Sequence, residues 1–185
     1  MINKAIILAG GTGTRLKPIT LTTNKQLLPI YDKPLIYYPL SSLMLAGIRN
    51  ILIIVNKGLV QNFKKILSDG SHLGIKISYK EQSKPTGIPD AFTIGKKFIK
   101  SDNIALILGD NFFFGTGFTG LLEKAKNMES GCYIFLKDVK NPKNYGVAVI
   151  KNKKIFKILE KPKKFISEKA ITGLYFFDNN IIKYS

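Results

Sequence analysis

The sequence predicts an α/β fold with a doubly wound, mostly parallel sheet, arranged as an α/β/α sandwich. Three short, continuously apolar runs have the length and composition of buried parallel strands, and they are residues 5–8, 51–55 and 104–108. Segments with helical spacing of apolar residues separate these runs. Strands and helices therefore alternate as they do in βα units, which build a parallel sheet with helices on its faces.

The other elements follow in chain order. The spacing predicts helices at residues 34–46, 60–67, 91–99 and 118–128. Gly47 ends the first helix, and Pro39 falls in its first turn, so the start of that helix is its least defined boundary. Short strands are expected at residues 74–79, 133–136, 147–150, 155–159 and 174–177. A chain of 185 residues normally forms one domain, which we expect to span residues 1–185.

The composition argues against several classes of protein. No apolar stretch approaches the length of a membrane span. The first apolar run ends in glycines rather than in a signal-peptidase cleavage site, so we expect no signal peptide. The single cysteine, Cys132, rules out an internal disulfide and fits a reducing compartment. Its apolar neighbours predict a buried structural thiol. With His72 as the one histidine, a histidine-based triad is nearly excluded. We expect a cytoplasmic protein with no membrane partner.

The net charge of +17 comes almost entirely from lysines that are spread over both halves of the chain. A basic surface can bind nucleic acid through the phosphates. However, the sequence has no RNP box, no zinc-ligand spacing and no arginine-rich arm, so nucleic acid is not an expected partner. Most of the excess positive charge is explained by lysines on solvent-exposed faces. The remaining functional explanation is that the positive charge steers anionic, phosphorylated substrates towards the protein.

A glycine-rich loop follows the first predicted strand, where residues 8–16 read Leu-Ala-Gly-Gly-Thr-Gly-Thr-Arg-Leu. Glycine lets backbone N–H groups approach a ligand closely, and several such groups after a strand form a nest for phosphate. Arg15 adds a planar charge suited to phosphate. The loop is not a Walker A motif, and Leu16 stands where a dinucleotide fingerprint has its third glycine. Taken alone, the loop leaves a plain strand-to-loop turn as the alternative.

Asp110 closely follows the third apolar strand, and ligands of doubly wound sheets bind at the carboxyl ends of strands. The loop and Asp110 would then share one crevice. A carboxylate at the mouth of an apolar strand is costly unless a cation meets it. Magnesium bound to nucleotide phosphates would supply that cation, while a turn cap at Asp110-Asn111 is the alternative.

Further motifs appear in order along nearly the whole chain. After the glycine loop and Lys17-Pro18 they are Lys25-Gln26-Leu27-Leu28-Pro29, Gln82, Gly87, Leu108-Gly109-Asp110-Asn111, Tyr145-Gly146-Val147, Glu160-Lys161-Pro162 and Thr172-Gly173-Leu174-Tyr175. Together they resemble the sugar-1-phosphate nucleotidyltransferases, and most closely the glucose-1-phosphate thymidylyltransferases. The resemblance implies a Rossmann-like nucleotidyltransferase fold.

The resemblance also implies a reaction. It is magnesium-dependent nucleotidyl transfer from dTTP to glucose 1-phosphate, giving dTDP-glucose and pyrophosphate. The sugar phosphate attacks the α-phosphorus in line, so no protein nucleophile is needed. Thymidylyltransferases usually carry Leu-Ala-Gln where residues 88–90 read Ile-Pro-Asp. Another base or sugar, with UTP or CTP, therefore stays open, as does a nucleotide-binding remnant without turnover.

The same resemblance implies site residues. Catalytic roles fall on Arg15, Lys25, Asp110 and Lys161, with Asp110 as the magnesium ligand. The implied nucleotide-binding residues are Gly10, Gly11, Gly13, Thr14, Arg15, Gln26, Gln82 and Gly87. The implied sugar-phosphate residues are Asn111, Gly146, Glu160, Lys161 and Ile171. Arg15 is expected to clamp the leaving pyrophosphate, and Lys161 to hold the sugar 1-phosphate.

Chains of that family continue beyond the position that matches Ser185. The resemblance therefore implies that a second metal aspartate, further sheet and the helices that build a homo-oligomer lie outside these 185 residues. Three alternatives stay open: a shortened relative with little activity, a partner that supplies the rest, or a metal held by Asp110 and substrate alone.

Overall fold

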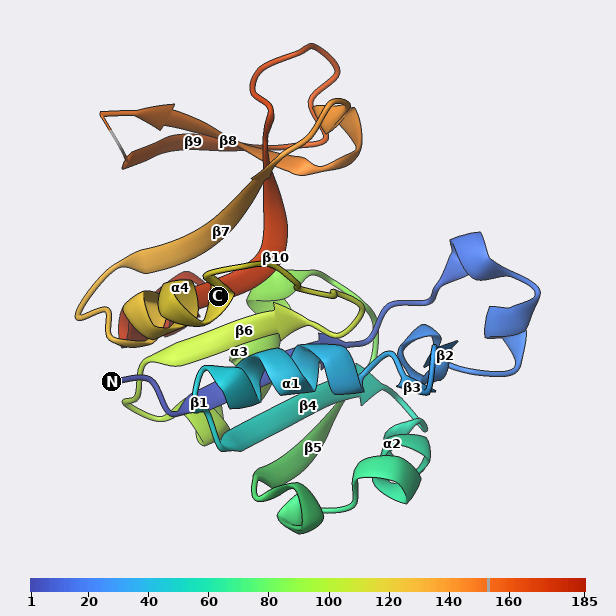
Figure 1. The fold of residues 1–185 in the computed structure, drawn as a ribbon. Helices are drawn as coiled ribbons and strands as arrows, with labels where there is room; N and C mark the ends of the chain where they lie inside the picture. Colours follow the sequence, from blue (N-terminus) through green and yellow to red (C-terminus); the bar gives the residue numbers. More distant parts are fainter. Residues whose placement is uncertain (153) are drawn as a thin grey trace. The chain divides into compact units, whose positions relative to one another are not determined.

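A computed structural model describes residues 1–152 and 154–185. The chain forms two compact units: unit 1 comprises Met1–Tyr133 and Phe176–Ser185, and unit 2 comprises Ile134–Tyr175. The predicted fold class is confirmed, because a mostly parallel central sheet carries helices on its faces (Figure 1). The expectation of a single domain over residues 1–185 stays a prediction.

The sheet of unit 1 has four parallel strands in the order β5-β4-β1-β6. They are β1 (Lys4–Ala9), β4 (Asn50–Asn56), β5 (Lys76–Gln82) and β6 (Ile104–Leu108). Most residues of β1, β4 and β6 are buried, as expected for strands covered on both faces. The register runs without a shift, so the carboxyl ends of all four strands lie at one edge of the sheet.

The α-helices of unit 1 are α1 (Tyr37–Leu45), α2 (Val60–Leu67), α3 (Ile88–Ile99) and α4 (Phe118–Lys126). Helix α1 lies on one face of the sheet and α3 on the other (Figure 1). Gly95 allows α3 to pack closely, because a Cβ there would lie 2.8 Å from Cδ1 of Ile6. The bounds of α2 and β6 match the sequence-based prediction, whereas α1 begins three residues later than expected.

The late start of α1 has a local cause. The backbone N–H of Leu35 donates to Leu28 O (2.9 Å), and that of Ile36 donates to Gln26 O (2.8 Å). These bonds hold the segment before α1 against the preceding short helix, and residues 33–34 pair with residues 29–30 as a strand, so the helix begins only after this hairpin. That region holds the 3₁₀ helices η1 (Thr14–Leu16), η2 (Ile19–Leu21) and η3 (Lys25–Leu27) and a hairpin of β2 (Pro29–Ile30) and β3 (Lys33–Pro34). Unit 1 also contains η4 (Ser71–Leu73) and η6 (Asn179–Tyr184).

Unit 2 is built from antiparallel strands. Strand β8 (Gly146–Lys151) pairs with β9 (Lys154–Glu160) and with β10 (Lys169–Phe177), which in turn pairs with β7 (Cys132–Asp138). The 3₁₀ helix η5 (Pro142–Asn144) precedes β8. The buried side chains of this unit include Phe135, Val147, Ala148, Ala170 and Leu174. The short strands predicted here are confirmed, although β10 begins five residues before the predicted start at residue 174.

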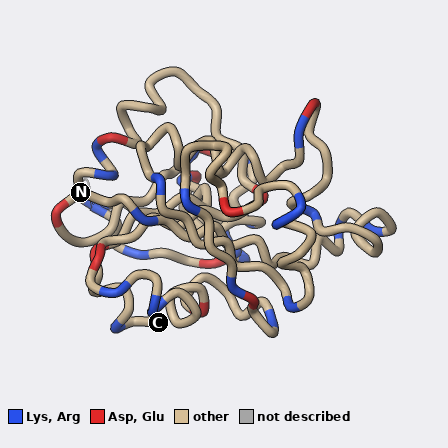
Figure 2. The backbone as a smooth tube through the Cα atoms, turned by 90° about the horizontal axis from the view of Figure 1, so that it is seen from below, with Lys and Arg blue, Asp and Glu red and all other residues tan. Residues whose placement is uncertain are grey.

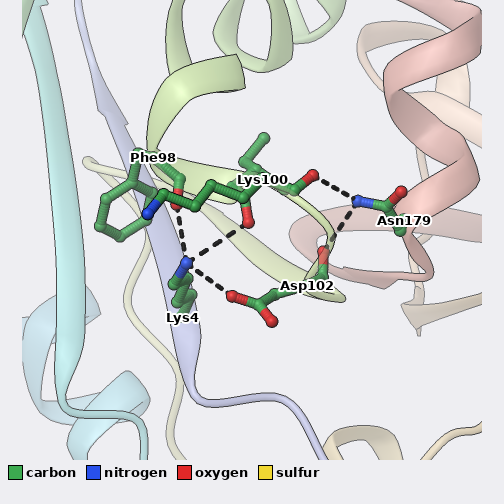
Figure 3. Close-up of polar contacts among 6 residues, drawn as sticks. Lys4, Phe98, Lys100, Asp102 and Asn179 are labelled. Carbon is green, nitrogen blue, oxygen red and sulfur yellow. Dashed lines mark hydrogen bonds and ion pairs between the residues drawn. The ribbon is translucent and has the colours of Figure 1, made fainter.

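A cluster of polar contacts at the amino ends of the unit 1 strands includes Asn179 from the carboxyl-terminal segment (Figure 3). Lys4 Nζ donates to Phe98 O (2.8 Å) near the end of α3 and forms an ion pair with Asp102. Asn179 Nδ2 donates to the carbonyl oxygens of Lys100 (2.8 Å) and Asp102 (3.3 Å). The cluster satisfies carbonyl groups left free at the helix end, which is a stabilising place for a lysine.

Cys132 departs from its prediction. It is exposed at the first residue of β7, immediately after Gly131, which has a φ of 85°. The prediction of a buried thiol was therefore wrong, because the apolar run that suggested it begins one residue later. The pKa of the Cys132 thiol is raised to about 11. Partial desolvation is the larger cause, and the negative charge of the Asp178 carboxylate is the smaller one. A thiol with such a pKa is protonated at neutral pH and is a poor nucleophile.

Lysine and arginine residues are distributed along most of the backbone rather than confined to one segment (Figure 2). Arg49, one of the two arginines, donates from Nη1 to Met44 O at 2.8 Å and to Ile48 O at 3.1 Å, at the end of α1. A positive charge at the carboxyl end of a helix interacts favourably with the helix dipole. None of the helices in the described part of the chain is long and apolar enough to cross a bilayer.

Candidate functional site

The glycine loop leaves β1 at the carboxyl edge of the sheet and is held by side chains from other elements. Gly10 is buried, and a Cβ at this position would overlap the amide nitrogen of Gln82. Gly13 has a φ of 62°, and its carbonyl accepts a hydrogen bond from Thr20 Oγ1 at 2.9 Å. Glycine is needed at the first position for close approach and at the second for a left-handed backbone.

Gln82 ties this loop to the sheet. Its Nε2 donates to Gly10 O (3.2 Å) and to Asn56 Oδ1 (3.1 Å), and the residue is only 3% exposed. Asn56 and Gln82 are register partners at the ends of the parallel strands β4 and β5. Gln82 taken by itself would suggest a surface amide, but the structure buries it against the glycine loop.

Asp110 and Lys25 form an ion pair beside the loop. Lys25 Nζ lies 2.7 Å from Asp110 Oδ2, and each side chain is about one-third exposed (31% and 32%). Lys25 opens η3, whose first turn is capped by Asn24 through a bond from Gln26 N to Asn24 Oδ1 (3.0 Å). The positive partner that Asp110 needs at the mouth of β6 is therefore a lysine from a distant part of the sequence.

A cavity of about 260 Å³ opens where these elements meet. Its lining residues are Leu8, Gly10, Gly11, Gln26, Gln82, Pro85, Gly87, Leu108 and Asp110. Six of the predicted nucleotide- or metal-binding residues are thus brought together in one place. The cavity lies at the carboxyl ends of β1, β5 and β6, which is where ligands of such sheets bind.

Gln26 contributes an unusual group to this cavity. The residue is 2% exposed, and its Oε1 is the one buried side-chain polar atom without a hydrogen-bond partner among residues 1–152 and 154–185. Leaving a buried acceptor unpaired costs about 1–3 kcal/mol. Because this oxygen has almost no accessible surface, a donor from a ligand can pair with it only if the Gln26 side chain turns towards the cavity.

Five predicted residues of unit 1 lie outside the cavity lining: Gly13, Thr14, Arg15, Lys25 and Asn111. Thr14 and Arg15 are exposed on η1, next to Gly13. Among the described residues Arg15 makes no hydrogen bond or ion pair, so its guanidinium can meet an anion. Asn111 follows Asp110, and its backbone N–H donates to Leu108 O at 3.2 Å.

Unit 2 brings together the remaining predicted residues. Gly146 and Glu160 are register partners in β8 and β9, and a Cβ at Gly146 would lie 3.0 Å from Glu160 Oε2 and 3.6 Å from Cδ1 of Ile171. Lys161 has a φ of 42°, and its N–H donates to Tyr145 O at 3.0 Å. Lys161 Nζ lies 3.6 Å from Glu160 Oε1, and both side chains are exposed.

The donor set for a metal is small. No group of three or more histidine, cysteine, aspartate or glutamate residues in the described part of the chain could hold a metal ion by itself. Magnesium, however, is commonly held by one or two carboxylates together with substrate phosphates and water. Asp110, which lines the cavity with a half-buried carboxylate, fits that role.

Sequence reasoning missed several residues of this site. Asn56 orients Gln82, Asn24 caps η3, and Pro85 lines the cavity beside Gly87. The position of Asn56 at the end of an apolar strand was the signal that could have found it. Asp110 was identified from the same kind of position.

Comparisons with known proteins identify the family of this chain. A family model described as nucleotidyl transferase matches residues 4–185. A glucose-1-phosphate thymidylyltransferase from Neisseria meningitidis serogroup A is 51% identical over 98% of this chain and 64% of its own length. One from Mycobacterium tuberculosis strain H37Rv is 47% identical over 97% of this chain and 62% of its own length. The chain thus spans slightly less than two-thirds of the curated relatives that it matches.

Solved structures show the same fold. A Bacillus anthracis protein assigned as a glucose-1-phosphate thymidylyltransferase, crystallised with sucrose, superposes with a TM-score of 0.91 at 39% identity. That match covers 98% of this chain and 73% of the other. A UDP-glucose pyrophosphorylase complexed with UDP-glucose superposes with a TM-score of 0.83 at 25% identity, covering 99% of this chain and 78% of the other.

Proposed function

Since this chain belongs to the nucleotidyl transferase family, we propose that it transfers a nucleotidyl group from dTTP to glucose 1-phosphate, giving dTDP-glucose and pyrophosphate. The names of the relatives support the reaction. The observation that carries the proposal is the cavity in which the glycine loop, Gln82 and Asp110 meet.

The nucleotide enters this cavity with its base toward Gln82 and Gly87. An amide pairs well with the imide edge of thymine or uracil. The backbone N–H groups of Gly10, Gly11 and Gly13 bind the phosphates, since the loop places them at the end of β1. The unpaired Oε1 of Gln26 accepts from a hydroxyl of the nucleotide sugar, because once the base is read, that hydroxyl is the remaining donor that a nucleoside triphosphate offers.

The chemical step is an in-line displacement. A phosphate oxygen of the sugar 1-phosphate forms a bond to the α-phosphorus, and the bond to the β-phosphate bridging oxygen breaks, so that pyrophosphate leaves with the electron pair. The protein positions two polyanions and neutralises charge that develops on the leaving group. Arg15, whose guanidinium is exposed beside Gly13, binds the leaving pyrophosphate. Lys25 assists it when phosphates replace Asp110 as its partner.

Magnesium is part of the proposal. Asp110 would hold it together with the phosphates, and when bound it supplies charge neutralisation at the leaving group. With a cation bound, Asp110 would serve as its carboxylate ligand, and Lys25 would be available to bind the phosphates. Both partners of the ion pair would then have a role in the reaction.

The sugar 1-phosphate is assigned to unit 2. Glu160 accepts hydrogen bonds from sugar hydroxyls, and Lys161 binds the phosphate. Gly146 leaves room beside Glu160, where a Cβ would lie 3.0 Å from the carboxylate. Ile171 belongs to the same group of residues, because its Cδ1 would lie 3.6 Å from a Cβ at Gly146.

The test is a direct assay. The chain is incubated with magnesium, dTTP and glucose 1-phosphate, and pyrophosphate release is measured together with the nucleotide sugar by mass spectrometry. A panel with UTP, CTP and other sugar 1-phosphates finds the preferred pair. Formation of dTDP-glucose supports the proposal. Nucleotide binding without turnover of any pair would instead identify a binding module, and the absence of both would reject the site.

A further inference from the structure

Asn56 and the carbonyl of Gly10 together determine which atom of the Gln82 amide is available to a ligand. The amide nitrogen Nε2 carries two hydrogens, and both are used: one meets Gly10 O at 3.2 Å and the other meets Asn56 Oδ1 at 3.1 Å. The carbonyl of Gly10 can only accept, so it requires the nitrogen rather than the oxygen of the amide to face it. The carbonyl oxygen Oε1 is therefore the remaining polar atom of Gln82.

The placement of Asn56 follows from the sheet. Asn56 ends β4, Gln82 ends β5, and the two are partners in an unshifted parallel register. Gln82 is 3% exposed and lines the cavity, so its amide has little room to rotate. Two hydrogen bonds hold one end of the amide, and the other end can act only as an acceptor.

We propose that Asn56 is a positioning residue for base selection, which holds Gln82 so that the site accepts pyrimidines with an N–H at position 3 and disfavours cytosine. The inference rests on the proposed function, because it takes Gln82 as the residue that reads the base. Thymine and uracil offer an N3–H to Oε1. Cytosine places a lone pair there, which leaves two acceptors facing each other and both unpaired.

The side chain of Asn56 accepts its hydrogen bond from Gln82, and it also lies beside Gly10, where an added Cβ would be 3.0 Å from Asn56 Oδ1. Because this hydrogen bond goes to the residue that reads the base and not to Arg15, Lys25 or Asp110, we expect the main effect of Asn56 to be on the affinity for the correct base. This separates a positioning role from a general structural one, because a loss of fold would lower the turnover of every nucleotide equally.

The experiment compares three forms of the full chain. Asn56→Leu removes the acceptor at similar size, and Asn56→Asp keeps an acceptor beside Nε2 as the matched control. Binding of dUTP and dCTP with magnesium is measured by calorimetry without sugar phosphate, since these two nucleotides differ only at the base edge in question. Wild type should favour dUTP. Asn56→Leu should lower that preference by about three- to tenfold, the effect of one hydrogen bond, and Asn56→Asp should retain it.

Steady-state kinetics with dTTP add a second readout, in which Asn56→Leu should raise KM and leave kcat nearly unchanged. A wild-type chain that binds dCTP as tightly as dUTP overturns the inference, and so does an unchanged preference in Asn56→Leu with a wild-type melting temperature. If Asn56→Leu does not fold, the preference measured on Asn56→Ala decides. A base preference that depends on Asn56 in a chain that releases no pyrophosphate supports the inference and rejects the proposed function.

Discussion

Lys25 and Asp110 form an ion pair, with 2.7 Å between Nζ and Oδ2, although 85 positions separate them in the sequence. The pair joins η3 to the end of β6 at the rim of the cavity. In the proposed reaction Asp110 would hold the metal and Lys25 would bind phosphate. The ion pair would then keep both side chains in place before substrate arrives.

Replacing Asp110 by asparagine should separate catalysis from stability. We expect Asp110→Asn to lower turnover by about a hundredfold or more and to weaken the response to magnesium, because the carboxylate ligand is lost. The free energy of unfolding should change by less than about 1 kcal/mol, since both partners of the ion pair are partly exposed. Chelation of magnesium should abolish wild-type turnover. Wild-type activity in excess chelator, or an unchanged magnesium titration in the variant, would contradict the assignment.

Arg15→Ala should reduce turnover by about tenfold or more, because the charge that develops on the leaving pyrophosphate loses its clamp. Pyrophosphate release at saturating substrates is the measurement. The other arginine provides the control: Arg49 is bonded to carbonyl groups at the end of α1, so Arg49→Ala should leave turnover per folded molecule unchanged. Equal rates for Arg15→Ala and wild type would remove the clamp from the mechanism.

Gly10→Ala should expel the Gln82 amide from its place, because the added Cβ would overlap Nε2. We expect a loss of nucleotide affinity of about tenfold and a loss of stability of about 1–3 kcal/mol, as for other overpacked sites. Calorimetry and urea unfolding measure the two effects. Gly120→Ala in α4 is the matched control, since a Cβ there has no neighbour within 4 Å. Normal nucleotide binding by Gly10→Ala would show that Gln82 is not held as described.

Lys4→Met should destabilise the chain by about 1–2 kcal/mol, since it removes a charged donor from the carbonyl groups at the end of α3 and from Asp102. The control is Lys96→Met, which replaces an exposed lysine of α3 and should have little effect on the free energy of unfolding. Urea midpoints with unchanged slopes would measure both changes. Turnover per folded molecule should stay at the wild-type level, because the cluster lies at the opposite edge of the sheet from the cavity.

The rate of alkylation of Cys132 should rise with pH and reach its midpoint near pH 11, because partial desolvation raises the pKa of the thiol from an ordinary value of 9.0 to about 11. At pH 8 the folded chain should react roughly tenfold or more slowly than a free cysteine, because only the thiolate reacts. The raised pKa also means that the folded state holds this proton more tightly than the unfolded state. Its contribution to stability is therefore complete below pH 9 and declines as the pH rises towards 11. A midpoint near 9 in the folded chain would contradict this.

The sequence was a good guide to elements whose signal is local. Residues 104–108 are continuously apolar and form β6, and residues 60–67 have an apolar helical face and form α2 with the predicted bounds. The start of α1 could not be predicted in the same way, because it depends on backbone bonds from Leu35 and Ile36 to the η3 region. Those bonds arise from tertiary contact and leave no periodic pattern.

The residues of the candidate site were also predictable only where their signal lies in the local sequence. The glycine loop and Asp110 were identified because each follows an apolar strand, which is a feature of the local sequence. The burial of Gln82 and the role of Asn56 were not, because they depend on two strands lying side by side in one register. The exposure of Cys132 was not predicted either, because the sequence does not show that the first residue of β7 lies at the surface.

The alignment of β4 with β5 has a consequence for how this protein can be altered. The two strands pair without a slip from Asn50 opposite Lys76 to Asn56 opposite Gln82. Successive strand residues point to opposite faces, so advancing β5 by one position would turn Gln82 away from the glycine loop. A change in the segment that connects the strands, residues 57–75, is therefore tolerated only where it leaves this pairing intact. An engineer who grafts a new segment there must check that Asn56 still lies opposite Gln82.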